Sequence, residues 1–330
     1  MRGNRRLAFV STLFAAALAV GGPAAAKDKL TFTYNTDPSH DAAVWAIANG
    51  KVKSDILDIE LKPLNIPAAQ QAMATKQFDV YENGLLALEY AAAQGLQMKM
   101  IGIELRYQPA PVGFGIWVKK DSPIKTVQDL KGKKIAVGGL RSTVLTVIRL
   151  AMQKKYGVNV ALDGGDFNFV QVPGPGMLPA LQTGRVDAAA LSHIQSWQAR
   201  KGEDYRMLIN SGEDLKEVFG FRVITTVLMG YKDRVEANPK LYREFLRMLK
   251  ESSDYVKKNP KEVFTALAAK AKIDPAFFED WFANYSEIPI SISDQDIQTI
   301  NRIWEMARQI GMSKNPGDVR DWIWEGAIRE

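Results

Sequence analysis

The sequence predicts an α/β protein of two lobes, each a mostly parallel sheet flanked by helices, with an all-helical C-terminal extension of the first lobe. Three observations carry this prediction. Short apolar strands alternate with helix-period segments through the first 200 residues, a pattern typical of parallel sheets covered by helices. A short internal sequence repeat relates two parts of the chain. From about Pro239 onward, the periodicity is helical only.

The predicted strands are short and apolar or alternate with period two, at residues 30–34, 59–61, 135–137 and 188–191. In the C-terminal third, helix start signals precede the helical segments. Asn238 stands before Pro239, and Ser293 stands before Asp294. This part of the chain therefore reads as a set of helices packed on the first lobe.

The internal repeat consists of the segments "QAMATKQFDV" and "PALQTGRVDA", which align without gaps at an offset of 108 residues. In each copy a helix ends near a threonine, and a strand then leads into a polar loop. The matched pairs are Ala72 and Ala180, Thr75 and Thr183, and Asp79 and Asp187. The four predicted polar loops are 35–41, 81–84, 138–143 and 192–195. Because ligands of open parallel sheets bind beyond the carboxyl ends of the strands, these loops are the expected ligand contacts.

Two apolar segments, "PVGFGIWVKK" and "FRVITTVLMGYK", are predicted to be the buried strands that carry the chain between the lobes. We therefore expect lobe one at 27–112 and 226–330, and lobe two at 113–225.

The first 26 residues have the layout of a cleavable secretory signal peptide. "MRGNRR" is positively charged, "LAFVSTLFAAALAV" is apolar but shorter than the roughly 20 residues of a membrane span, and Ala24-Ala25-Ala26 precedes the predicted cleavage after Ala26. We expect an exported, periplasmic protein.

Composition excludes several functions. The chain has no cysteine, so disulfides, thiol nucleophiles and cysteine-ligated metals are absent. Once the three arginines of the predicted signal peptide are removed, the chain has 40 basic and 37 acidic residues. The two signs alternate along the chain with no basic stripe, which argues against nucleic-acid binding.

Residues Gly138 to Thr143 follow a predicted strand and open a predicted helix. Glycines allow close backbone approach, free N–H groups and the helix dipole favour an anion, and Arg141 can form a bidentate contact with an oxyanion. The alternative is a plain turn in which Ser142 is an N-cap and Arg141 a surface charge.

Both histidines of the chain, His40 and His193, fall in the predicted polar loops. No nucleophile elbow or HExxH motif is present, and neither histidine has a second ligand at helical spacing, so we predict neither a catalytic nor a metal site. Glu82, in another predicted loop, either accepts a hydrogen bond from a ligand or pairs with a lysine at the rim.

The segment "WVKKDSPIKTVQDLKGKKIAV", with "VPGPGMLPALQTGRVDAAALSHIQSW" and "QQAMATKQFDVYENG", resembles the solute-binding proteins of ABC importers, in the nitrate/sulfonate/taurine group. The resemblance covers about 30–325. It implies the two-lobed periplasmic-binding-protein fold (type II), hinge closure over a solute and no enzymatic activity or cofactor. It also implies delivery by a monomer to a membrane permease that ATPase subunits drive.

Carried over by position, the resemblance and the loops together predict twelve ligand-binding residues: Asn35, Thr36, Ser39, His40, Glu82, Asn83, Gly139, Arg141, Ser142, Thr143, Ser192 and His193. Two departures leave the solute open. At the predicted helix start, residues 140–143 stand where sulfonate binders often carry a Ser/Thr-Ser/Thr-x-His motif. In the second pocket loop, residues 192–195 stand where the family often has an aromatic-Asp-Pro motif. A sister group, the fungal pyrimidine-precursor synthases, depends on a cysteine-rich motif that this chain lacks.

The sequence therefore predicts capture of a small organic anion, a sulfonate such as taurine or a carboxylate. The first alternative is the same transport role with a neutral or cationic solute, such as a pyrimidine of the thiamine-precursor type, recognised by Glu82 and the two histidines. The second is an exported hydrolase that uses His40 or His193.

Overall fold

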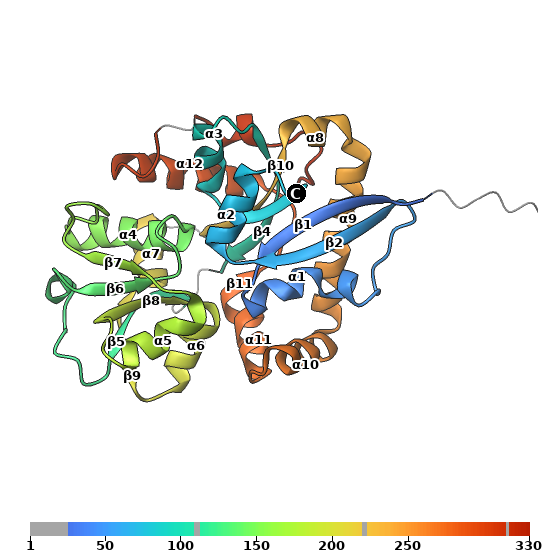
Figure 1. Ribbon diagram of the computed structural model, residues 1–330. Helices are drawn as coiled ribbons and strands as arrows, with labels where there is room; N and C mark the ends of the chain where they lie inside the picture. Colours follow the sequence, from blue (N-terminus) through green and yellow to red (C-terminus); the bar gives the residue numbers. More distant parts are fainter. Residues whose placement is uncertain (1–25, 109–112, 220–222, 315–316) are drawn as a thin grey trace, which may run out of the picture.

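The computed structural model describes residues 26–108, 113–219, 223–314 and 317–330, which form two sheets lying side by side (Figure 1). The predicted signal peptide falls on residues 1–25, outside the described residues. Within the described ranges, no helix combines the length and the apolar character that crossing a membrane requires.

The first sheet has six strands in the order β11-β4-β10-β3-β1-β2. Strand β1 pairs in parallel with β2 and β3, whereas β10 lies antiparallel between β3 and β4. The strands are β1 (Asp28–Asn35), β2 (Leu57–Leu64), β3 (Val80–Gly84), β4 (Met98–Tyr107), β10 (Ile224–Tyr231) and β11 (Ser286–Glu287).

The second sheet has five strands in the order β7-β6-β8-β5-β9. Strand β6 pairs in parallel with β7 and β8, and β5 is antiparallel to β8 and β9. The strands are β5 (Phe114–Lys119), β6 (Lys134–Val137), β7 (Asn168–Gln171), β8 (Ala188–Ser192) and β9 (Tyr205–Asn210). All strands of this sheet come from 114–210, and β5 and β10 occur within the two segments predicted to carry the chain between lobes.

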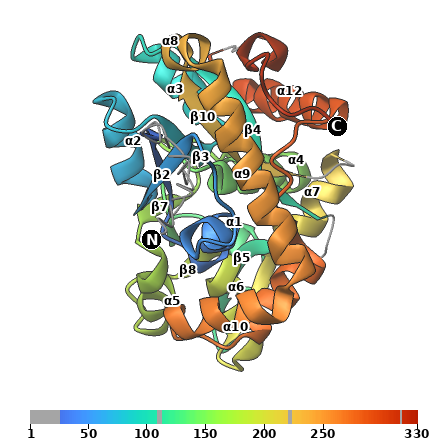
Figure 2. The same cartoon turned by 90° about the vertical axis from the view of Figure 1, so that its right-hand side faces the viewer.

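Helices flank both sheets. In the first lobe α1 packs on α9 and α10, and the long α9 crosses the whole lobe (Figure 2). In the second lobe α4 packs on α7, and α5 packs on α6. The helices are α1 (Pro38–Ala48), α2 (Ile66–Ala74), α3 (Ala87–Ala93), α4 (Thr143–Tyr156), α5 (Gly174–Gln182), α6 (His193–Lys201), α7 (Ser211–Phe219), α8 (Lys232–Ala237), α9 (Pro239–Lys258), α10 (Pro260–Ala271), α11 (Ala276–Asp280) and α12 (Asp294–Gln309).

The C-terminal extension is mostly helical as predicted, but it also contains the two-residue strand β11 and isolated β-bridges at Ile290, Ile292, Ile323 and Arg329. The helical structure of residues 317–330 is limited to the 3₁₀ turn Val319–Trp322, although a helix was expected there.

Strand β11 pairs with the end of β4, where Ser286 lies opposite Tyr107. A π-helical turn, Trp281–Tyr285, leads into it. The pairing covers backbone groups that the edge of β4 would otherwise leave open.

The two copies of the internal repeat form the same local structure in both lobes. Thr75 and Thr183 each place a hydroxyl on the carbonyls three and four residues before them, at the ends of α2 and α5. Asp79 accepts a hydrogen bond from the N–H of Thr31 at 2.8 Å, and Asp187 accepts one from the N–H of Lys134 at 2.8 Å. The repeated residues therefore fix each helix end and hold the next strand beside its parallel neighbour.

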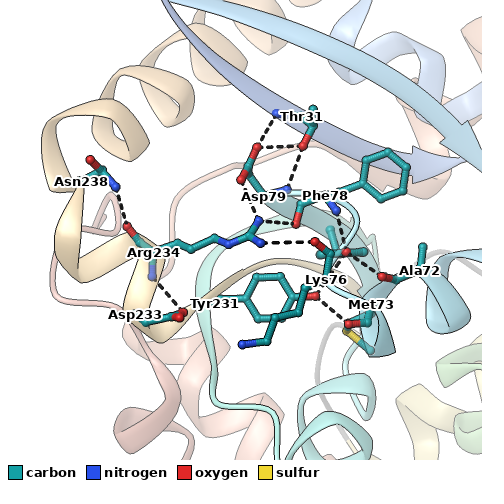
Figure 3. Close-up of polar contacts among 11 residues, drawn as sticks. Thr31, Ala72, Met73, Lys76, Phe78, Asp79, Tyr231, Asp233, Arg234 and Asn238 are labelled. Atoms are coloured by element: carbon teal, nitrogen blue, oxygen red, sulfur yellow. Dashed lines mark hydrogen bonds and ion pairs between the residues drawn. The ribbon is translucent and has the colours of Figure 1, made fainter.

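In the first lobe a further contact fixes the turn between α2 and β3. Figure 3 shows Arg234 of α8 reaching Asp79, with Nη1 donating to Oδ1 at 2.8 Å and to the carbonyl of Phe78 at 3.1 Å. Its Nη2 donates to the carbonyl of Lys76 at 3.2 Å. The turn before β3 is thus tied to the C-terminal part of the chain, and β3 carries side chains of the site described below.

The internal repeat also predicts that substitutions at two equivalent positions change the free energy of unfolding in opposite directions. Lys76 adopts φ 55°, and Gly184, at the matching position 108 residues later, adopts φ 72°. A left-handed conformation costs a residue with a Cβ roughly 1–2 kcal/mol, partly offset by the entropy that glycine loses on folding. We expect Lys76→Gly to raise the free energy of unfolding in urea by up to about 1 kcal/mol, and Gly184→Lys to lower it by a similar amount.

Lys76→Ala is the matched control, because it removes the side chain but keeps the strained backbone. A Lys76→Gly variant no more stable than Lys76→Ala would contradict this account.

Candidate functional site

A cavity of about 60 Å³ lies between the two lobes. Since a water molecule needs roughly 10–15 Å³, the closed cavity has room for only a few waters or a small solute group. The first lobe contributes residues from β1, α1, α2 and β3, and the second lobe contributes the starts of α4 and α6. The lining residues are Asn35, His40, Leu64, Ile66, Ala69, Glu82, Asn83, Gly84, Ser142, Thr143, Val144, His193, Thr225 and Thr226.

The chain places His40 through the start of α1. Asp37 is the N-cap, and its carboxylate accepts a hydrogen bond from the N–H of Ser39. Pro38 follows at the first helical position, where its missing N–H costs nothing. His40 therefore sits in the first turn of α1, beyond the carboxyl end of β1, and its side chain is 2% exposed.

His40 lies between two buried carboxylates from β3 and β4, the two strands that flank β10. Its Nδ1 is 2.9 Å from Glu82 Oε1 on β3 and 3.1 Å from Glu104 Oε2 on β4. The side chains of Glu82 and Glu104 are 2% and 1% exposed. Glu82 also accepts a hydrogen bond from the N–H of Asn35 at 3.3 Å. The wall of the cavity on this side is thus acidic, with two carboxylates to one imidazole.

His40, Glu82 and Glu104 form the acidic corner of the cavity, in which the pKa values of Glu104 and His40 are shifted. Burial, helped by the negative charge of Glu82, raises the pKa of Glu104 to about 7. Burial alone would lower the pKa of His40, but Glu82 and Glu104 raise it well above its ordinary range. His40 therefore keeps its proton and its positive charge, but the two carboxylates still outnumber this one imidazolium.

The second lobe faces this wall with the start of α4. Ser142 is the N-cap and accepts a hydrogen bond from the N–H of Leu145 at 3.2 Å, and α4 ends at Gly157, which has φ 63°. Thr143, the first helical residue, is buried, and its Oγ1 has no hydrogen-bond partner among the described residues. The amide Nδ2 of Asn83, across the cavity, also lacks one. These groups are free to bind a solute.

His193 of the second lobe inserts into the first lobe. Its Nδ1 is 2.8 Å from Ser39 Oγ, its Nε2 is 2.9 Å from Tyr107 Oη, and its ring stacks on Trp281 at 4.6 Å. Ser39 donates its own hydrogen to Asp37, so the Nδ1–H of His193 must donate to Ser39. Burial keeps the pKa of Tyr107 well above its usual value, so Tyr107 donates to Nε2. Both ring nitrogens are therefore used in holding the lobes together.

This arrangement is not a catalytic triad, although Ser39, His193 and Asp37 lie together. In a triad the serine and the aspartate contact opposite nitrogens of the imidazole. Here Ser39 and Asp37 both approach Nδ1, at 2.8 and 3.6 Å, and Tyr107 occupies Nε2. The geometry gives the hydrolase alternative no activated hydroxyl at this position.

Seven of the twelve predicted residues line the cavity, and five do not. Ser39 is buried beneath His193, Thr36 is exposed, and Gly139 and Ser192 lie behind the lining residues. Arg141 is exposed, and its guanidinium lies over the ring of Tyr90 on α3, 5.3 Å from the centroid. The guanidinium of Arg141 therefore lies outside the cavity lining in this form, and its bidentate contact with an anion stays a prediction. Among the described residues, no lysine or arginine lines the cavity.

Two further predictions need correction. Residues 38–41, 81–84 and 192–195 were expected in loops. Residues 81–84 instead belong to β3 and 192 ends β8, because both segments are hydrogen-bonded to neighbouring strands, and residues 38–41 and 193–195 lie in the first turns of α1 and α6. No metal-ligand group was expected, yet His40, Glu82 and Glu104 converge. The sequence interpretation missed Glu104; the available signal was a carboxylate inside the otherwise apolar segment "MKMIGIELRY".

A family model described as "NMT1/THI5 like" matches residues 37–263. The chain belongs to this family. The matched range includes both walls of the cavity.

Individual relatives are distant. A yeast protein, "4-amino-5-hydroxymethyl-2-methylpyrimidine phosphate synthase THI13" of Saccharomyces cerevisiae, is 25% identical over 246 residues, 71% of this chain and 68% of that protein. The solved alkanesulfonate-binding protein SsuA of Xanthomonas axonopodis pv. citri, bound to MOPS, has a TM-score of 0.72 at 19% identity and covers 93% of this chain and 100% of its own.

A putative sulfonate ABC transporter periplasmic binding protein, SsuA of Methylobacillus flagellatus, has a TM-score of 0.57 at 16% identity, covering 90% of this chain and 92% of its own. These likenesses show that the NMT1/THI5-like chain has the periplasmic-binding-protein fold.

The contact between β3 and α4 predicts that Gly84 cannot carry a side chain in the closed form. A Cβ on Gly84 would lie 2.6 Å from Thr143 Oγ1 and 3.4 Å from Thr143 N. We expect Gly84→Ala to shift the protein toward an open form, seen as a larger radius of gyration in small-angle X-ray scattering. The double variant Gly84→Ala/Thr143→Ala should recover part of the closed form, because the nearer clash is with the threonine side chain. An unchanged radius for Gly84→Ala would contradict the expected close approach.

The position of His193 predicts a second effect on closure. His193→Ala removes two buried interlobe hydrogen bonds, each contributing about 0.5–1.5 kcal/mol, and should change the ratio of closed to open protein roughly tenfold or more. Since the chain has no cysteine, spin labels on Lys62→Cys and Lys154→Cys report the interlobe distance by pulsed electron paramagnetic resonance.

Ser192→Ala is the neighbouring control and should leave the distance distribution unchanged. Tyr107→Phe, which loses one of the two hydrogen bonds, should fall between the control and His193→Ala. A closed distribution in His193→Ala would refute the interlobe role of the histidine.

Proposed function

We propose that this protein is the solute-binding component of an ABC importer, located in the periplasm, which closes over a small neutral or cationic solute and delivers it to a membrane permease. The observation that carries the proposal is the interlobe cavity, whose lining comes from both lobes at the ends of their strands and the starts of their helices. Such a cavity is complete only when the lobes are closed, so solute capture and closure are coupled.

The polarity of the solute follows from the charges of the cavity wall. Glu82 lines the cavity, with Glu104 directly behind it, and the single imidazole of His40 faces both carboxylates. Burying an unpaired anion beside these groups would be costly, because like charges interact strongly away from water. A solute that presents an N–H group or a positive charge to Glu82 is instead stabilised.

The opposite side of the solute should accept hydrogen bonds. Asn83 Nδ2 and Thr143 Oγ1 are buried donors without partners among the described residues, and leaving such groups unpaired costs about 1–3 kcal/mol each. An amino-substituted nitrogen heterocycle carries N–H donors and ring-nitrogen acceptors on one small molecule. The aminopyrimidine ring of the compound in the yeast relative's name has this chemistry and supports the choice, although that compound also carries an anionic phosphate.

A sulfonate is the second candidate. The start of α4 offers the positive end of a helix dipole and the Thr143 hydroxyl, and two structural neighbours are named as sulfonate-binding proteins. Binding it in this cavity would require Arg141 to leave Tyr90 and turn inward, or Glu82 to bind a proton.

Closure supplies the signal that a permease can recognise. A solute shifts the population only by as much as it prefers the closed form, and moving from 1:99 to 99:1 takes about 5.5 kcal/mol. The contacts of His193 already favour the closed form without solute, so the hydrogen bonds to Glu82, Asn83 and Thr143 need to supply only the remainder. The protein acts as a monomer in this scheme and needs neither a cofactor nor enzymatic turnover.

Two substitutions distinguish the two solute classes. We expect Glu82→Gln to weaken binding of a neutral or cationic solute at least tenfold, because a charge-assisted hydrogen bond contributes about 1.5–3 kcal/mol. Arg141→Ala should change the affinity less than twofold. The measurement is isothermal titration calorimetry, after a thermal-shift screen of aminopyrimidines, other amino-heterocycles, taurine, alkanesulfonates, nitrate and aromatic carboxylates.

The opposite pattern would overturn the proposal: a sulfonate or carboxylate hit whose affinity falls in Arg141→Ala and is unchanged or higher in Glu82→Gln. Turnover of a bound compound would favour the hydrolase alternative instead.

A further inference from the structure

Three buried atoms with lone pairs converge at the acidic corner of the cavity. His40 Nδ1, a carboxylate oxygen of Glu82 and one of Glu104 all lie within 4.8 Å of one another. They come from α1, β3 and β4, three separate elements of the first lobe. The residues are separated in sequence by dozens of positions, so only the fold brings them together.

Hydrogen bonds do not fully explain this arrangement. His40 Nδ1 carries at most one hydrogen, yet carboxylate oxygens lie 2.9 and 3.1 Å away from it. One hydrogen serves one of the two carboxylates well and leaves the other poorly bonded. In addition, Glu104 Oε1 is buried and has no hydrogen-bond partner among the described residues. A buried acceptor without a partner is the second sign that a cation belongs here.

We propose that His40, Glu82 and Glu104 form a binding site for one divalent transition-metal ion. An imidazole nitrogen with two carboxylates suits zinc, manganese or iron better than calcium or magnesium, which prefer oxygen ligands alone. The ion balances the two carboxylates with two positive charges, whereas a protonated His40 supplies only one and gives up its proton when the metal binds.

The distances fit such an ion after a small adjustment. Zinc binds histidine nitrogen and carboxylate oxygen at about 2.0–2.2 Å, so tetrahedral ligands stand roughly 3.3–3.5 Å apart. The separations from His40 Nδ1 are 2.9 and 3.1 Å. Moving the carboxylates outward by a few tenths of an ångström makes room for the metal.

The site has an open side. His40 and Glu82 line the interlobe cavity, so the fourth coordination position faces the place where the solute binds. Three protein ligands with one open position are typical of metals that contact a small molecule. In the metal-loaded protein a lone pair of the solute would complete the coordination shell. This inference goes beyond the proposed function and does not rest on it, because the metal alone is the probe.

The chain is well suited to a clean test. It has two histidines and no cysteine, so adventitious zinc sites are scarce. No other group of three such side chains converges in the part of the chain that the structure describes.

The experiment titrates ZnCl2 into tag-free protein, previously dialysed against a chelator, by isothermal titration calorimetry. We expect one ion per chain, and at least a tenfold loss of affinity in Glu104→Gln. Even residues that only orient metal ligands cost 10–100-fold when replaced, so a ligand should cost no less. Glu262→Gln is the matched control, since Glu262 is an exposed carboxylate paired with Lys51, and its zinc affinity should equal that of the wild type.

Circular dichroism checks that Glu104→Gln is folded, and His40→Asn replaces it if it is not. X-ray absorption spectroscopy of the zinc-loaded wild type gives a readout that needs no variant, and it should show one imidazole with oxygen ligands. Absence of stoichiometric zinc binding, an unchanged affinity in the folded variant, or a shell without imidazole would each overturn the proposal. None of these outcomes bears on solute capture, because the calorimetry of Glu82→Gln and Arg141→Ala is run on chelator-treated, metal-free protein.

Discussion

The buried contact of His40 with Glu82 and Glu104 is the constraint on which the site depends. Removing three ionisable groups from water is costly, so the arrangement persists only because α1, β3 and β4 hold it rigidly. The Asp37 cap with Pro38 sets the first turn of α1, and the pairing of β3 with β1 and β10 sets Glu82. Two carboxylates share one imidazole, and this shortage of positive charge determines which protons, ions or solutes the cavity accepts.

Closure of the lobes rests on a different set of polar contacts. His193 uses both ring nitrogens on first-lobe hydroxyls, and Arg200 of α6 reaches Asp280 at 2.6 Å and the hydroxyl of Tyr285 at 2.7 Å. His193 adopts φ 50°, a strained conformation for a residue with a Cβ, and such strain persists where the surroundings fix it. These contacts are polar, buried at His193 and half-buried at Arg200, so they can form and break as the lobes move, whereas an apolar seam would hold the closed form too firmly.

The sequence predicted the features that depend on local spacing. The sequence repeat places Thr183 and Asp187 at the positions of Thr75 and Asp79. These residues form hydrogen bonds to their own helix or to the adjacent strand, so identical residues at a fixed offset are enough to identify the repeat. Ser142 as an N-cap was predictable for the same reason. The direction of Arg141 was not, because Tyr90 of the other lobe decides where the guanidinium rests. Glu104 was missed because its partners lie 22 and 64 residues away. The acidic character of the wall, and with it the preferred charge of the solute, therefore emerges only from the tertiary structure.

The central claim is that an acidic wall selects the solute of this NMT1/THI5-like protein. The most direct measurement is mass spectrometry of the compound released when protein purified from an exporting host is mildly denatured. The account predicts a small molecule that is uncharged or positively charged at neutral pH and carries N–H groups. Recovery of a fully ionised sulfonate or nitrate in stoichiometric amount would contradict it.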